Sequence, residues 1–185
     1  MAVKSKGVVA ALLTIGAVLA SGLLLRVDST ASGEPGALET ALMRRLRRWL
    51  TPEQLIRTPN PAANDAATLR RARLHYADHC AFCHGADGAG GQFHFYPPAP
   101  DLRQGTQQLS DGEIYFAIAS GIRFSGMPAF GDGSANDLES WELVRLIRAL
   151  PQLSPQELQE IAERSPQGVR LLRERREEEE FLHAP

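Results

Sequence analysis

The sequence predicts an all-α fold. Apolar residues recur at helical spacing in several segments, and Ser and Glu stand where helix N-terminal capping boxes need them. No stretch of useful length alternates apolar and polar residues as a half-buried strand does. The chain has 185 residues, enough for one compact domain with additional segments at its ends. The net charge of −2 gives no indication of nucleic-acid binding.

Residues 1–27 are predicted to be a membrane anchor or an export signal. Lys4 and Lys6 precede an uncharged stretch over residues 7–25, and Arg26 follows it. As a helix rising about 1.5 Å per residue, this stretch nearly covers the hydrocarbon core of a bilayer. Its length favours an uncleaved transmembrane helix over a removed signal peptide, and over a buried helix of a soluble protein. Both of the first two interpretations export the rest of the chain and keep the lysines inside.

Residues 28–65 are predicted to form a basic amphipathic helix and a linker. We favour a helix over 37–50 that packs its apolar stripe on the folded domain and leaves a basic face in solvent; the alternative is a helix lying on anionic headgroups. Thr51 and Gln54 have the spacing of a capping box for a short further helix. The Pro-Asn-Pro sequence at 59–61 then marks a domain boundary. The stripe over 37–50 consists of Leu38, Leu42, Leu46, Trp49 and Leu50, and the flanking arginines are Arg44, Arg45, Arg47 and Arg48.

Residues 66–150 are predicted to be the core domain. A helix over 68–78 leads directly into Cys80. Glycine-rich and proline-rich loops follow, and Ser110 with Glu113 forms a capping box that begins the next helix. The closing helix covers residues 137–150.

Residues 151–185 are predicted to form a charged helical extension. Ser154 and Glu157 have capping-box spacing, and Pro155 stands at the first helical position. We favour helices lying on the domain with solvated charges over a tail that docks a partner. Pairs four residues apart, such as Arg173 and Glu177, can offset one another.

The most specific signal in the core domain is the Cys-Ala-Phe-Cys-His run at residues 80–84. Two thiols at this spacing add across the two vinyl groups of a porphyrin, and the following imidazole is placed to bind iron. The chain has two cysteines, and both lie in this run. A zinc site built from Cys80, Cys83, His84 and a nearby His75 or His79 lacks a second Cys pair. A thioredoxin-like redox dithiol would need a βαβ setting, and the sequence predicts none.

Met127 is the candidate for a second iron ligand. It stands between Gly126 and Pro128 in a loop between two predicted helices. The glycine permits close approach of the backbone, and the proline restricts the loop. A thioether ligand favours Fe(II) and raises the reduction potential. A buried core methionine is the plain alternative, and His94 is a second candidate for the sixth ligand.

Residues 66–150 resemble the class I cytochrome c domain. The resemblance identifies Cys80 and Cys83 with the thioether attachment points of one haem c, His84 with the proximal ligand and Met127 with the distal ligand of its iron. Tyr76 matches the family's aromatic position on the first helix, and Pro97 or Pro98 is the candidate whose carbonyl accepts the other ring N–H of the histidine. The sequence departs from the family at two helix-crossing positions, which here are Ala72 and Leu146.

The resemblance implies a cytochrome c-like fold around one covalently attached haem, and an electron carrier rather than an enzyme. Its partners are expected to be redox proteins, met at the outer face of the bacterial inner membrane. There the haem domain is expected in the periplasm, either tethered by a single-pass helix or soluble after cleavage. A haem subunit of a membrane dehydrogenase or reductase is the alternative. A peroxidase-like or gas-binding haem protein is less favoured, because it requires Met127 to dissociate.

Overall fold

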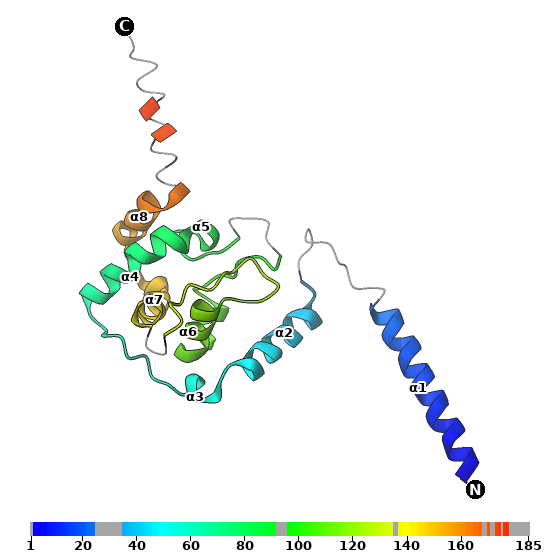
Figure 1. The fold of residues 1–185 in the computed structure, drawn as a ribbon. Coiled ribbons are helices and arrows are strands. Elements are labelled where there is room, and N and C mark those ends of the chain that lie inside the picture. Colours follow the sequence, from blue (N-terminus) through cyan, green and yellow to red (C-terminus); the bar gives the residue numbers. More distant parts are fainter. Residues whose placement is uncertain are drawn as a thin grey trace. The chain divides into compact units, whose positions relative to one another are not determined.

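The computed structural model describes residues 2–24, 35–91, 96–134 and 137–167, and residues 170, 173, 174, 176 and 177. The chain divides into two compact units, Met1–Gly33 and Glu34–Pro185. Every regular element in the described ranges is helical, which confirms the predicted all-α class (Figure 1). His94, the alternative second ligand, lies outside the described residues.

In the first unit the structure describes helix α1 over Ala2–Leu24. Of the helices that the structure describes, none combines the length and the apolar character that crossing a bilayer demands. The transmembrane helix predicted for residues 1–27 is therefore not supported by the structure.

The second unit is built around the packing of α4 (Ala66–His79) on α7 (Leu138–Ala149), with α6 (Asp111–Ser120) packed against α7 (Figure 1). Each helix begins at a side-chain cap: Asp65 accepts from the Thr68 amide, Ser110 forms the predicted capping box with Glu113, and Asp137 accepts from Ser140. Ala72 and Leu146, the two positions at which the sequence departs from the family, are both buried between these helices. The core includes Ala72, Tyr76, Ala77, Ile114, Ile118, Trp141, Leu143, Val144, Leu146 and Ile147.

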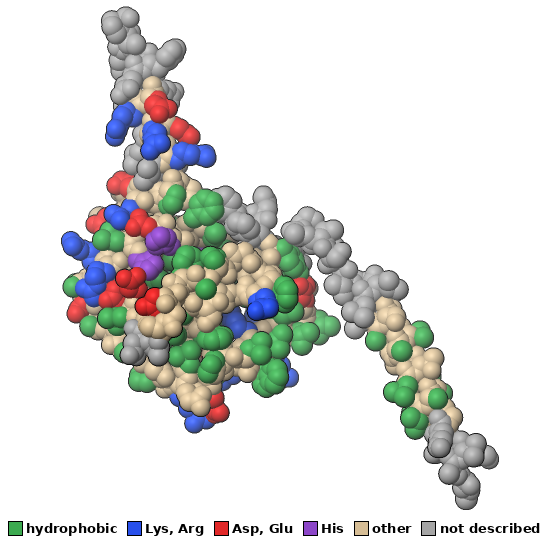
Figure 2. Space-filling view, in the orientation of Figure 1, with side chains coloured by type: hydrophobic (Ala, Val, Ile, Leu, Met, Phe, Trp, Pro, Cys, Tyr) green, Lys and Arg blue, Asp and Glu red, His purple; other side chains and the backbone are tan. Residues whose placement is uncertain are grey.

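Helix α2 (Ala37–Leu50) does not have the orientation that we favoured from the sequence. Its apolar stripe does not pack on the domain, since Leu38 is 71% exposed and Trp49 is 80% exposed. The edge that faces the domain is polar: the Tyr96 hydroxyl donates to the Glu39 carboxylate, and Arg48 lies 3.4 Å from Glu113. Hydrophobic side chains accordingly lie on the surface along α2 (Figure 2).

Helix α3 (Glu53–Ile56) follows at once, and here the predicted capping box is wrong. The Thr51 hydroxyl donates back to the Arg47 carbonyl at 2.9 Å and closes α2 instead of capping α3. Helix α3 packs on α6 through a close backbone contact, because a Cβ on Gly112 would lie 1.7 Å from the Leu55 carbonyl oxygen. This glycine is required by the packing.

The C-terminal extension begins with the short 3₁₀ helix η2 (Leu150–Gln152) and continues as α8 (Pro155–Arg164). The predicted capping box of Ser154 and Glu157 is present. Helix α8 packs on α4 and buries Ile161, while Arg164 pairs with Asp78 at 2.7 Å (Figure 1). Acidic and basic side chains are intermixed on this side of the molecule (Figure 2).

Candidate haem site

The two thiols lie at the end of the first core helix. Cys80 follows α4 and precedes α5 (Ala81–His84), so one helical turn separates it from Cys83. Both side chains line the same cavity. Burial raises the pKa of the Cys80 thiol to about 12 and also raises the pKa of Cys83. Both groups are therefore neutral thiols at ordinary pH.

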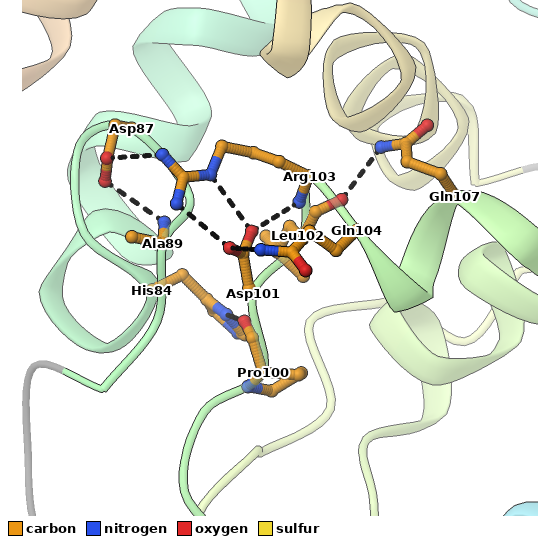
Figure 3. Close-up of polar contacts among 9 residues, drawn as sticks. All are labelled: His84, Asp87, Ala89, Pro100, Asp101, Leu102, Arg103, Gln104 and Gln107. Carbon is orange, nitrogen blue, oxygen red and sulfur yellow. Dashed lines mark hydrogen bonds and ion pairs between the residues drawn. The ribbon is translucent and has the colours of Figure 1, made fainter.

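The imidazole of His84 lines the same cavity, and a loop carbonyl holds it in place. Its Nδ1 lies 3.4 Å from the Pro100 carbonyl oxygen (Figure 3). The prediction that Pro97 or Pro98 takes this role is therefore wrong. With Nδ1 donating to the carbonyl, Nε2 is left with its lone pair. Burial lowers the pKa of His84, which favours the neutral form that binds metals.

Two close contacts fix the loop that follows His84. At its start, the buried Tyr76 hydroxyl donates to the Gly85 carbonyl at 2.9 Å. Further along, Gly90 has a positive φ of 76°, and a Cβ there would lie 2.2 Å from the Ala99 carbonyl oxygen. This close approach brings the residues before Pro100 against the loop after His84, so the carbonyl at position 100 faces the imidazole.

A cluster of charged side chains lies next to the Pro100 carbonyl. Arg103 donates to Asp101 through Nε and a terminal nitrogen, and it reaches Asp87 at 2.8 Å (Figure 3). The charged hydrogen bonds from Arg103 lower the pKa of Asp101 from 3.8 to about 2. The cluster joins the residue after Pro100 to the loop that follows His84.

The replacement Asp101→Asn is expected to destabilise the holoprotein at neutral pH. Asp101 has a lower pKa when folded, so its contribution is complete above the unfolded value of 3.8 and is lost as the pH falls through about 2. The difference in unfolding free energy between wild type and variant should therefore be constant near neutrality and shrink between these two values. Denaturant titrations across this range measure it. A difference independent of pH would contradict this role for Asp101, and Glu163→Gln at an exposed position of α8 is the control.

Met127 lies in a turn that hydrogen bonds close tightly. Its carbonyl accepts from the Ile122 amide at 3.1 Å, and its amide donates to the Ser125 hydroxyl at 3.2 Å. Gly121, with φ of 68°, ends α6, and a Cβ there would lie 2.9 Å from the Met127 carbonyl oxygen. The turn places the Met127 side chain against the core and in the lining of the cavity.

The cavity that these segments enclose has a volume of about 160 Å³ and a lining that is almost entirely apolar. Cys80, Cys83, His84 and Met127 all line it, although they come from two parts of the chain. Such a space suits a large apolar ring that needs two thiols, a neutral imidazole and a thioether. The residues present therefore fit a haem. The other lining side chains include Tyr76, Leu102, Leu109, Ile114, Ile118, Phe130, Leu143 and Ile147.

The competing metal and dithiol sites have no support in the described parts of the chain. There, no group of three or more His, Cys, Asp and Glu side chains is arranged to hold a metal ion. His75 and His79 instead pack edge to face, with ring centroids 5.0 Å apart. The described ranges also contain no strand, so the βαβ setting of a redox dithiol is not found in them.

Residues 67–147 match the family model described as cytochrome c oxidase, cbb3-type, subunit III. These residues form a class I c-type cytochrome domain. A domain of this family carries covalently attached haem c with its iron, so the family and the cofactor predicted from the Cys-x-x-Cys-His run are confirmed. Comparison with curated proteins gave no match, and comparison with solved structures gave none.

Arg47 is a lining residue of this c-type cytochrome domain that sequence reasoning missed. It comes from α2, outside the residues that match the family. Its place in an amphipathic pattern indicated a solvated basic face, yet the side chain is half-buried at the cavity. Burial lowers the pKa of Arg47, while the Glu113 carboxylate acts in the opposite direction. No spacing in the sequence distinguishes it from its neighbours Arg44 and Arg45.

Proposed function

We propose that this protein is a one-electron carrier whose haem iron is bound by His84 and Met127. Cys80 and Cys83 form the two thioether links in this proposal. The observation that carries it is the convergence of these four side chains on one apolar cavity, with no acidic side chain among the described residues that line it. The family match supports haem-mediated electron transfer in general, and the geometry favours this ligand set in particular.

The chemistry that the haem supplies is a change of one electron at its iron. The contribution of the protein is to hold that iron in one environment through the change. The Pro100 carbonyl orients His84, and the Ile122–Met127 turn holds the thioether, so neither ligand has to move. With a haem bound, the apolar lining would keep water away from it. Because neither ligand has to move, the reorganisation energy of electron transfer is small. A small reorganisation energy favours rapid electron exchange over substrate binding.

The second candidate function is that of a haem subunit within an oxidoreductase complex. One observation favours it: the matching family model is described as a subunit of an oxidase. The chemistry of the haem is the same in both proposals, and they differ in whether the redox partners bind transiently or permanently.

We also propose that the haem domain works on the outer side of the bacterial inner membrane, in the periplasm. The support is the N-terminal sequence, in which lysines precede a long uncharged stretch. Export is expected whether this segment is retained or cleaved. Fractionation of cells that express the whole chain tests this location.

The spectrum of the purified holoprotein tests the proposed function. We expect a low-spin iron in both oxidation states, a reversible one-electron titration, and no binding of carbon monoxide by the reduced protein. These results follow if both axial positions are occupied by protein ligands. A high-spin oxidised form, or ready binding of carbon monoxide, would favour the peroxidase-like or gas-binding alternative.

A further inference from the structure

The inward edge of α2 places one arginine at the haem cavity. On this helix only Glu39, Thr40 and Arg47 are half-buried, and all other α2 residues are exposed. Glu39 accepts a hydrogen bond from Tyr96. Arg47 lines the cavity together with Cys80, His84 and Met127. It is the one Lys or Arg in that lining among the described residues.

The guanidinium of Arg47 differs from those of the other half-buried arginines that the structure describes. Arg73, Arg103 and Arg148, for example, each donate to a carboxylate. In the described part of the chain, the Arg47 guanidinium has no hydrogen bond and no ion pair. Glu113, the acidic residue that influences it, already accepts from the Ser110 amide at 2.8 Å and from Arg48 at 3.4 Å. Glu113 therefore offsets the desolvation of Arg47 only in part, and no anion in the described part of the chain is bonded to this half-buried cation.

The haem that belongs in this cavity carries two propionate carboxylates. A carboxylate next to an apolar cavity requires a charged donor, and arginine suits it because its guanidinium is weakly hydrated and donates in a fixed fork. We propose that Arg47 is the counter-charge of a haem propionate. The inference rests on the proposed function, and it assigns a cofactor-binding role to a segment before the family match at 67–147.

Two electrochemical consequences follow from this pairing. A cation at the propionate keeps that group ionised and offsets its negative charge. Without it, the uncompensated carboxylate stabilises Fe(III), so the midpoint potential falls. The pKa of the propionate also rises, and the potential then decreases as the pH increases through that pKa. At low pH the propionate is protonated and carries no charge. The midpoint potential of a protein without the cation then approaches that of the wild type.

The test compares Arg47→Gln with Arg45→Gln in the full-length holoprotein. Both arginines lie on α2, but Arg45 is exposed and outside the cavity. We expect Arg47→Gln to have a lower midpoint potential near neutral pH and a stronger pH dependence, whereas Arg45→Gln matches wild type. Equal potentials in the two variants at every pH would overturn the assignment.

A second pair of variants covers the case in which Arg47→Gln yields too little holoprotein. Arg47→Lys and Arg47→Met both keep a long side chain, and only lysine keeps the charge. The lysine variant should retain the potential of wild type and the methionine variant should not; the same potential in both would count against the pairing. A wild-type spectrum without His/Met features would instead refute the proposed function, so the two failures are distinguishable.

Discussion

Replacing both Cys80 and Cys83 with serine is expected to abolish covalent haem attachment and to prevent the domain from folding. The cavity between α4, α6 and the Met127 turn is about 160 Å³. At ~24 cal/mol per Å³, leaving it unfilled costs about 4 kcal/mol. That is a large part of the roughly 5–15 kcal/mol by which a domain is normally stable. The double variant should therefore lose both its absorption bands and most of its helical circular dichroism.

The single variants Cys80→Ser and Cys83→Ser are the matched controls for this experiment. Each retains one thiol at the cavity, so each can retain one thioether link and a filled core. A double variant that is folded, monomeric and free of haem would contradict our account of the core.

Replacing Met127 with alanine is expected to remove the sulfur-to-iron charge-transfer band completely and to lower the midpoint potential. Methionine withdraws electron density from the iron and favours Fe(II), so its loss stabilises Fe(III). The open position should also let the reduced variant bind carbon monoxide. Optical spectra and a potentiometric titration measure the three effects on one sample.

Met43 provides the control for this variant, because it is the other methionine after the first residue. It lies on α2 and is 55% exposed. Met43→Ala should therefore leave the band and the potential unchanged. If the band survives in Met127→Ala, the sulfur ligand assigned here is wrong. If the wild type itself lacks the band, His94 would need to be tested next.

Local patterns account for the parts of the structure that the sequence predicted correctly. A capping box needs only two residues three positions apart, so Ser110 with Glu113 and Ser154 with Glu157 could be recognised directly. The motif at residues 80–84 is equally local. Met127 could be chosen because methionine is rare in this chain and its neighbours are Gly126 and Pro128.

The parts that could not be predicted depend on contacts between distant segments. Hydrophobic periodicity indicates that α2 is amphipathic, but it does not show which face packs on the domain when polar partners such as Tyr96 and Glu113 compete. The carbonyl that holds His84 belongs to Pro100 because Gly90 packs closely against Ala99. The closely spaced prolines of that loop offer no local signal that distinguishes them.

Covalent attachment of haem to Cys80 and Cys83 can be measured as the mass of the intact polypeptide after denaturation in acid. Protein produced in cells that attach haem to exported chains should therefore keep, through acidified organic extraction, a mass increase of one haem. A polypeptide of unmodified mass, with the pigment in the organic phase or with no pigment, would contradict the account.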